Sequence, residues 1–202
     1  MIALVDYGMG NLGSVDKALH YVGAEPVVTS DPAEVERAEA IVLPGVGACG
    51  DCMANLRDGG LLDPVKHAIA AGKPYLGICL GLQILFEESE EGGGVECMGI
   101  IPGSVQRFRH ELKIPQIGWN QISLRAKAPH LAGVPDGSWV YFVHSYHVVP
   151  DDEAVVATTT DYGYEFVSAV HSNNIFATQF HPEKSQEVGL QMLRSFCGLV
   201  GA

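Results

Sequence analysis

Residues 74–91 constrain the fold of this chain more than any other stretch. The apolar run at 75–78 is typical of a short, buried parallel strand. From Leu80 onward the apolar spacing changes to that of a helical face. Residues 77–81 read Gly-Ile-Cys-Leu-Gly, a Gly-x-nucleophile-x-Gly pattern with cysteine as the nucleophile. The sequence therefore predicts Cys79 at a sharp turn between a central strand and a helix.

The spacing of the two glycines has a steric explanation. A sharp strand-to-helix turn strains the backbone at Cys79, and side chains at positions 77 and 81 would collide across it. The turn also places the sulfur at a helix N-terminus, where free N–H groups stabilise negative charge. The alternative is a buried core cysteine whose neighbouring glycines only permit tight packing. A nucleophile needs a base, so the rest of the chain decides between the two interpretations.

A suitable base follows the apolar run at 176–180. The sequence there is His181-Pro182-Glu183, and the proline makes the turn rigid. Histidine can accept the thiol proton and later deliver it to a leaving amine, while a carboxylate fixes its tautomer. As a pair with Cys79, this turn predicts a Cys-His-Glu triad. Taken alone, it could equally be a His-Pro turn chosen for its geometry.

The first half of the chain alternates strands with helices. Predicted strands cover 2–5, 27–29, 40–43 and 74–78, and predicted helices cover 12–22, 33–37 and 61–71. After an acidic and glycine-rich stretch at 87–94, expected to be a mobile loop, the second half is richer in strands. Its predicted strands cover 98–101, 105–108, 121–124, 139–143 and 155–159, followed by a hairpin of 166–170 with 175–179 and a helix over 185–200.

This order predicts the fold class α/β. We expect a doubly wound, mostly parallel central sheet with helices on both faces and an additional antiparallel β portion in the C-terminal half. The sequence contains neither an internal repeat nor a recognisable linker. A chain of 202 residues can bury a substantial core, so we expect one domain, 1–202.

Two glycine-rich loops lie at the ends of predicted strands. The loop 44–50 follows a buried strand, where its peptide N–H groups could approach a developing oxyanion. It contains Cys49-Gly-Asp-Cys52, but neither a second such pair nor a suitable histidine pair accompanies it, so we predict no metal site. The earlier motif Gly8-x-Gly10-x-x-Gly13 lacks the acidic residue of a dinucleotide site, and a tight turn bringing Asn11 to a surface fits better.

Composition excludes several classes of function. The net charge is −12, from 12 basic and 24 acidic residues, which argues against nucleic acid as the main partner. Apolar runs stay far below the roughly 18 residues that a membrane span requires, so we expect no membrane partner. The five cysteines are odd in number and scattered, and the N-terminus begins directly with a strand instead of a signal peptide. A cytoplasmic protein is the simplest expectation.

The motifs GICLG, PGVG and HPE together resemble the class I, triad-type glutamine amidotransferases. These enzymes hydrolyse the side-chain amide of glutamine and pass the ammonia to a partner. More narrowly, the chain is similar to the glutamine amidotransferase subunits of imidazole glycerol phosphate synthase, in histidine biosynthesis. The strings that carry this resemblance are DYGMGNLGSV, LPGVGA, GICLGLQILFEESEE, IPQIGWN, YFVHSY and QFHPEKS. Cys49 and Cys52 depart from the family, in which an aromatic residue usually follows the PGVGA string.

The resemblance implies a role for each matching residue. Cys79 would be the nucleophile, His181 the base and acid, and Glu183 the group that orients it. The oxyanion hole would use the N–H of Leu80 and one from Val46 or Gly47. Glutamine would be held by Gln83, Glu91, Ser145 and Tyr146, and the partner-facing surface would include Asn11, Trp119, Asn120, Tyr141 and Lys184.

The resemblance also implies a β/α-barrel synthase (cyclase) subunit as the partner in a heterodimer, with glutamine as substrate and without a cofactor. Two alternatives stay open from the sequence. One is the amidotransferase subunit of another pathway, such as aminodeoxychorismate or anthranilate synthesis. The other is a regulatory module that keeps the fold without turnover, which an intact Cys-His-Glu set disfavours.

Overall fold

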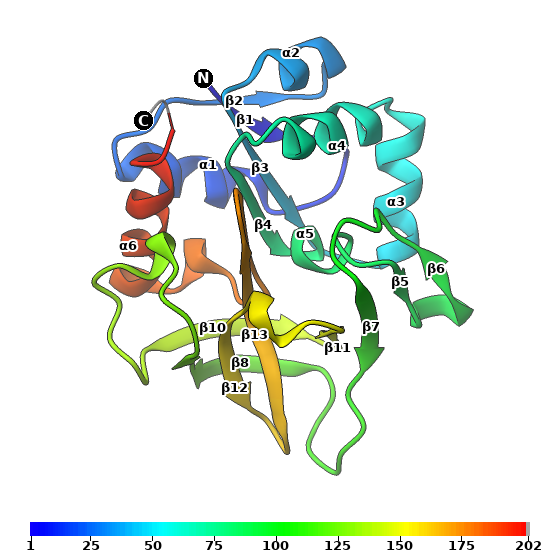
Figure 1. The fold of residues 1–202 in the computed structure, drawn as a ribbon, viewed down its shortest axis with the longest axis vertical. Coiled ribbons are helices and arrows are strands. Elements are labelled where there is room, and N and C mark those ends of the chain that lie inside the picture. The colour runs from blue at the N-terminus through cyan, green and yellow to red at the C-terminus, as the bar shows by residue number, and fades with distance from the viewer. Residues whose placement is uncertain (201–202) are drawn as a thin grey trace.

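A computed structural model describes residues 1–200. Its central sheet contains five parallel neighbours in the described part of the chain, in the order β2 (Pro26–Thr29), β1 (Ile2–Val5), β3 (Ala40–Gly45), β4 (Tyr75–Cys79) and β14 (Ile175–Thr178). Figure 1 shows β3, β4 and β14 running through the middle of the molecule. Because β14 joins β4 in parallel register, the two segments that carry the proposed nucleophile and base are neighbours.

Helices cover both faces of the parallel sheet (Figure 1). One face carries α1 (Leu12–Tyr21) and α6 (Gln186–Cys197), and the other carries α2 (Pro32–Arg37), α3 (Cys49–Asp58) and α4 (Leu62–Ala70). Side chains along β4 point alternately to the two faces of the sheet, so Tyr75 packs into one core cluster while Leu76 and Ile78 pack into the other. Each cluster lies between the sheet and one of the two helical layers. The expected doubly wound sheet is therefore confirmed.

The sheet continues beyond β14 in antiparallel pairing, as the second half of the sequence predicts. The added strands are β13 (Glu165–Ser172), β11 (Tyr146–Pro150), β7 (Gly103–Arg107), β5 (Glu88–Ser89) and β6 (Val95–Glu96), with β12 (Val156–Asp161) and β9 (Ser123–Leu124) beside β13, although β5 and β7 pair in parallel. A separate antiparallel ribbon consists of β8 (Gln116–Gln121) and β10 (Trp139–His144). The predicted hairpin of β13 with β14 is confirmed, and Asn173 in its turn has a left-handed backbone with φ 52°.

The structure corrects the interpretation of the residues that follow Cys79. The helix α5 (Leu80–Gln83) is only four residues long. It ends early because the carbonyl groups of 84–86 accept hydrogen bonds from the N–H groups of 98–101. For the same reason 98–101 is a loop, although its sequence predicts a strand. The residues 87–94, expected to be a loop, contain the two-residue strand β5 and a 3₁₀ helix over Glu91–Gly93.

Three further elements differ from the predictions. Cys49 and Cys52 begin α3 instead of lying in a loop, because with Met53 and Leu56 they form a buried helical stripe. The predicted strand 121–124 is divided between β8 and β9. Strand β11 was not predicted, although it pairs with β7 over its whole length.

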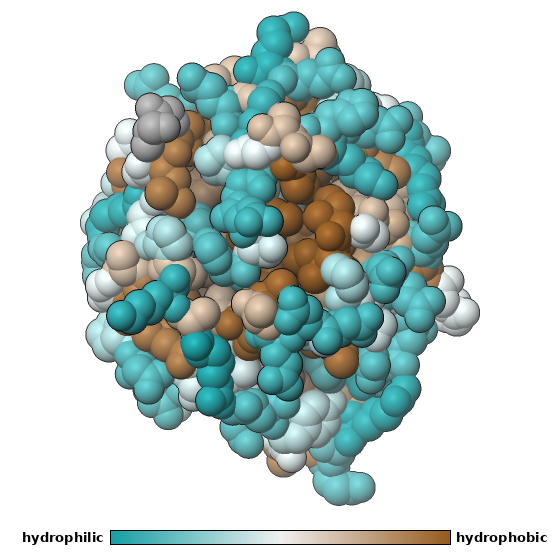
Figure 2. Space-filling model, in the orientation of Figure 1, coloured by the Kyte–Doolittle hydropathy of each residue, from teal (hydrophilic) through white to brown (hydrophobic). Residues whose placement is uncertain are grey.

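The surface of the molecule is mainly polar on the face shown in Figure 2, with apolar side chains gathered near its centre. This agrees with the excess of acidic residues in the sequence. Within residues 1–200, the helices are all too short or too polar to cross a membrane.

Candidate active site

Cys79 occupies the sharp turn that its sequence predicts. It ends β4, precedes α5 and has a left-handed φ of 57°, which is rare for a residue with a side chain. A Cβ at Gly77 would lie 2.3 Å from the Gly81 carbonyl oxygen, and one at Gly81 would lie 2.0 Å from that of Leu43. The Tyr75 hydroxyl donates to the Gly81 carbonyl at 2.8 Å. Gly77 is therefore required by the turn itself, and Gly81 by the close approach of the neighbouring strand β3.

His181 and Glu183 form a buried pair. The Nδ1 of His181 lies 2.8 Å from Oε1 of Glu183, and both side chains are almost fully buried. Burial alone lowers the pKa of His181, but the Cys79 sulfur and the Glu183 carboxylate more than offset this and raise it to about 10. The imidazolium form of His181 is thus favoured at neutral pH. Its Nε2 is left without a hydrogen-bond partner among the described residues.

The backbone around His181 is fixed to the ribbon and to α6. The His181 N–H donates to the Tyr141 carbonyl at 2.9 Å, and the Ser185 hydroxyl accepts from the Tyr141 N–H at 3.0 Å. The same hydroxyl donates to the His181 carbonyl at 2.6 Å. Gly189 of α6 permits the close approach of this turn, because a Cβ there would lie 1.9 Å from the Pro182 carbonyl oxygen. Sequence reasoning missed Ser185 and Gly189, since their roles depend on contacts between distant segments.

A cavity of about 450 Å³ opens beside Cys79. Its lining includes the residues for which the sequence predicts oxyanion and glutamine-binding roles. The lining residues are Val46, Gly47, Cys79, Leu80, Gln83, Glu91, Pro115, Val143, His144, Ser145, Tyr146 and Lys184. They come from the loop after β3, the end of β4, α5, the 3₁₀ helix at Glu91–Gly93, the residue before β8, the segment from the end of β10 to the start of β11, and the 3₁₀ helix at Pro182–Lys184. The structure therefore places the predicted oxyanion and glutamine-binding residues around one cavity.

The loop after β3 is shaped for contact with Cys79. Gly47 has a φ of 105°, so its backbone conformation is one that favours glycine. A Cβ at Gly45 would lie 2.6 Å from Leu80 Cβ and 2.4 Å from the Tyr7 hydroxyl. That hydroxyl donates to the Pro44 carbonyl at 2.9 Å and so holds the loop. Tyr7 is a further residue that the sequence analysis did not identify.

Gln83 is held by two protein contacts. Its Nε2 donates to the Tyr146 carbonyl at 3.2 Å and to Gln179 Oε1 at 3.0 Å. Both amide hydrogens are thereby used, and the side-chain oxygen remains the group that can accept from a ligand. Gln179 in turn approaches Cys79, with 3.6 Å between its Nε2 and the sulfur. Gln179 lies just past β14, and its contact with the nucleophile was not anticipated.

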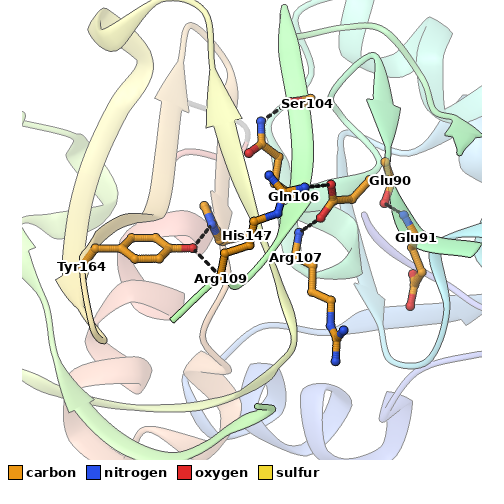
Figure 3. Close-up of polar contacts among 9 residues, drawn as sticks. Glu90, Glu91, Ser104, Gln106, Arg107, Arg109, His147 and Tyr164 are labelled. Atoms are coloured by element: carbon orange, nitrogen blue, oxygen red, sulfur yellow. Dashed lines mark hydrogen bonds and ion pairs between the residues drawn. The ribbon is translucent and has the colours of Figure 1, made fainter. Parts of the chain in front are cut away.

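Glu91 is tied to α3 as well as lining the cavity. Its Oε2 accepts from the Cys49 N–H at 2.6 Å, at the N-terminus of α3. Figure 3 shows the neighbouring residue Glu90 accepting from the Arg107 N–H and from the Arg109 guanidinium, the latter at 2.6 Å. These contacts fasten the turn that carries Glu91 to β7.

His144 is buried and lines the same cavity. Its Nδ1–H donates to the Tyr146 carbonyl at 2.7 Å. Burial lowers the pKa of His144 to about 3, so it stays neutral. His144 therefore stabilises the Ser145–Tyr146 turn as a neutral group. His181 differs from it, because its positively charged form is favoured.

The predicted partner-facing residues fall into two groups. Lys184, the residue after Glu183, lies over the Tyr141 ring at 5.7 Å, and Trp119 packs on the same ring at 6.0 Å in an edge-on arrangement. Trp119 is 44% exposed. Asn120 instead bonds the Asp161 carbonyl through its Nδ2 at 2.8 Å, and Asn11 occupies the N-cap of α1, half-buried.

A family model for class I glutamine amidotransferases matches residues 3–198. Among curated relatives, a protein of Geobacter sulfurreducens named imidazole glycerol phosphate synthase subunit HisH is 54% identical over 202 residues, covering 96% of this chain and 97% of the relative. A protein of the same name from Aquifex aeolicus is 52% identical over 194 residues, covering 96% and 94%.

Solved structures support the fold. A crystal structure of a glutamine amidotransferase has a TM-score of 0.79 at 20% identity and covers all of both chains. The structure of PurLQS from Thermotoga maritima has a TM-score of 0.77 at 21% identity and covers 98% of this chain and 97% of its own.

Proposed function

We propose a catalytic mechanism on the premise that the chain belongs to the class I glutamine amidotransferases, among the glutaminase subunits of imidazole glycerol phosphate synthase in histidine biosynthesis. In this proposal Cys79, His181 and Glu183 hydrolyse glutamine to glutamate and ammonia. Residues 1–202 act as one amidotransferase domain. The reaction uses the side chains and backbone of this chain and needs no metal or cofactor.

The first chemical step is attack of the Cys79 thiolate on the amide carbon of glutamine. The developing oxyanion is stabilised by the Leu80 N–H and by an N–H from Val46 or Gly47, which line the cavity beside the sulfur. His181 donates its proton to the amide nitrogen, so ammonia leaves and a γ-glutamyl thioester remains. The raised pKa of His181 supports this role, because the imidazolium is ready to donate.

Water then cleaves the thioester. His181, now neutral, accepts a proton from the water, and the returning thiolate leaves as glutamate forms. Glu183 orients the imidazole through the Nδ1 contact and stabilises its charge. The amino and carboxylate ends of glutamine are held by Gln83, Glu91, Ser145 and Tyr146, which supply polar side chains to the cavity lining.

We further propose that the ammonia passes to a β/α-barrel synthase subunit in a cytoplasmic heterodimer. The surface group of Trp119, Tyr141 and Lys184 supports a docking role, since Trp119 and Lys184 are exposed and the carbonyl of the half-buried Tyr141 accepts a hydrogen bond from the His181 N–H. Asn11 and Asn120 would extend this surface. Neither nucleic acid nor a membrane is a partner in this proposal.

The observation that carries the proposal is the strained position of Cys79 at the end of β4, next to the strand β14 that leads into the buried His181–Glu183 pair. In the complex with its synthase, Cys79→Ala should abolish glutamine-dependent synthesis and leave ammonia-dependent synthesis intact. Parallel assays with glutamine and with an ammonium salt measure both activities. Cys197→Ala is a matched control at a cysteine far along α6. Loss of both activities in a correctly assembled Cys79→Ala complex would refute the assignment.

A further inference from the structure

Three buried cysteines gather next to the proposed active site but take no part in the mechanism. Cys49 and Cys52 lie on the first turn of α3, and Cys97 follows β6. The sulfur atoms of Cys49 and Cys97 are 3.4 Å apart although 48 residues separate them in sequence. The thiols of residues 1–200 are all free. Among residues 1–200, neither these sulfurs nor other side chains form a group that could hold a metal ion.

Cys49 connects this thiol pair to the glutamine cavity. It follows the 44–48 loop directly, and its N–H donates to Glu91, which lines the cavity. Cys97 is joined to the other side of Glu91, because its N–H donates to the Glu87 carbonyl at 2.9 Å. Movement of the two sulfurs toward each other would therefore act on both segments that hold Glu91.

The chemistry of Cys49 differs from that of its neighbours. A hydrogen bond from the Cys97 thiol lowers the pKa of Cys49 in spite of burial, and raises that of Cys97. Burial raises the pKa of Cys52 to about 12. Cys49 is consequently the nucleophilic sulfur of the cluster, with Cys97 as the thiol facing it, whereas Cys52 is a core residue.

We propose that Cys49 and Cys97 form a reversible redox pair, which a peroxide converts into a disulfide that alters glutamine binding at Glu91. The Cys49 thiolate attacks one peroxide oxygen and the O–O bond breaks, giving a sulfenic acid and, after protonation, water. The Cys97 sulfur then attacks Cys49 sulfur, and the sulfenic oxygen leaves as a second water. Two thiols are oxidised and one hydrogen peroxide is reduced. A dithiol reverses the step by exchange.

The expected consequence lies in substrate binding. Bond formation draws the sulfurs from contact to about 2 Å, and so displaces the Cys49 N–H that holds the Glu91 carboxylate. This part rests on the proposed role of Glu91 in binding glutamine. We expect the disulfide to raise the KM for glutamine several-fold and to leave kcat less affected, because Cys79, His181 and Glu183 do not contact the pair.

The first test identifies the disulfide without using turnover. Full-length Cys79→Ser protein is treated with hydrogen peroxide, alkylated in denaturant, digested without reduction and analysed by mass spectrometry. A peptide pair joined through Cys49 and Cys97 is expected, which dithiothreitol should separate. Cys52→Ser added to this protein should retain the link and Cys97→Ser should lose it. Alkylation of both thiols after treatment, or a link from Cys49 to Cys52, would overturn the proposal.

The second test measures glutamine kinetics in the complex with the synthase, for the wild type and Cys97→Ser after the same peroxide treatment. Oxidation of Cys79 itself removes active sites equally from both. A rise in KM should therefore occur in the wild type alone and reverse with dithiothreitol. An equal KM in the two proteins would overturn the predicted effect on binding. Because the first test needs no activity, failure of the disulfide is distinguishable from failure of the proposed glutaminase mechanism.

Discussion

At the scale of single residues, His181 combines two opposing influences. Burial disfavours its charge, while Cys79 and Glu183 favour it, and the net effect raises its pKa to about 10. A raised folded-state pKa contributes stability below the unfolded value of about 6.5, and this contribution is lost as pH rises through about 10. The charged histidine is therefore both a stabilising group and the proton donor of the proposed reaction.

The two members of this pair should respond differently to substitution. His181→Asn should remove measurable turnover, because the proton carrier is gone. Glu183→Gln should keep a remnant, reduced by about 100-fold or more, because orientation of the ring is impaired but proton transfer persists. Steady-state glutaminase assays of both complexes measure this. If both variants kept near-native rates, the turn would be structural only.

At the scale of elements, the contact between α6 and the 3₁₀ helix η4 (Pro182–Lys184) positions the base. Gly189 provides the space for this contact, since it packs against the Pro182 backbone. The Ser185 hydroxyl then fixes the same turn to β10 through Tyr141. The face of α6 that covers the sheet therefore also determines the position of His181.

Gly189→Ala should disturb this arrangement. The added methyl group meets the Pro182 carbonyl, so the turn or α6 must shift, at a cost of about 1–3 kcal/mol in the free energy of unfolding. We expect kcat to fall more than KM rises, since His181 moves while the glutamine contacts stay. Gly198→Ala is a matched control at the end of the same helix, where a Cβ meets atoms no closer than 3.5 Å. Denaturant unfolding and kinetics that were equal for the two variants would contradict the positioning role.

At the scale of the whole molecule, the site spans segments from both halves of the sheet and borders the ribbon. We expect the loop of residues 44–47 to present either a carbonyl or an N–H toward Cys79, because glycine at 45 and 47 permits the peptide to turn. Tyr141 joins the exposed aromatic surface to the backbone of His181. A synthase subunit bound at that surface, as proposed, would therefore contact the element that holds the proposed base.

The isolated subunit should have very low glutaminase activity. Loss of one oxyanion donor costs about 100- to 1,000-fold in rate. Binding of the ligand-loaded synthase should restore kcat far more than it lowers KM. Lys184→Glu should weaken this coupling without unfolding the subunit, since the Lys184 side chain is on the surface. High turnover by the isolated chain, or activation confined to KM, would exclude an oxyanion switch.

Acid should destabilise the whole fold through buried neutral histidine. His130 stacks on Phe176 of β14 at 4.4 Å, and burial lowers its pKa to about 4. The unfolded chain binds this proton near pH 6.5, so stability is present above that pH and is lost as pH falls toward 4, by on the order of 3 kcal/mol. His130→Leu should reduce the slope of unfolding free energy against pH by about one proton. Identical slopes in the wild type and His130→Leu would contradict the prediction.

The sequence alone determined the features that depend on near neighbours in the chain. The Gly77–Gly81 spacing predicted the strained turn at Cys79, and residues 181–183 predicted a rigid turn with its carboxylate two residues from the histidine. Continuous apolar runs predicted the central parallel strands, because a strand covered by helices on both faces buries its side chains on both sides. Each of these patterns lies within a few consecutive residues and can be recognised without the tertiary structure, although the clash that excludes a side chain at position 81 is with Leu43 of β3.

Tertiary structure decided what depends on partners far along the chain. The helix after Cys79 stops at Gln83 because distant N–H groups take the carbonyls that would have extended it. Gln179, Ser185 and Gly189 approach the site through pairing and packing that local pattern does not record. The Cys49–Cys97 contact joins residues 48 positions apart. Hydrogen-bond competition and close packing between segments are properties of the assembled chain, and so the sequence could not reveal them.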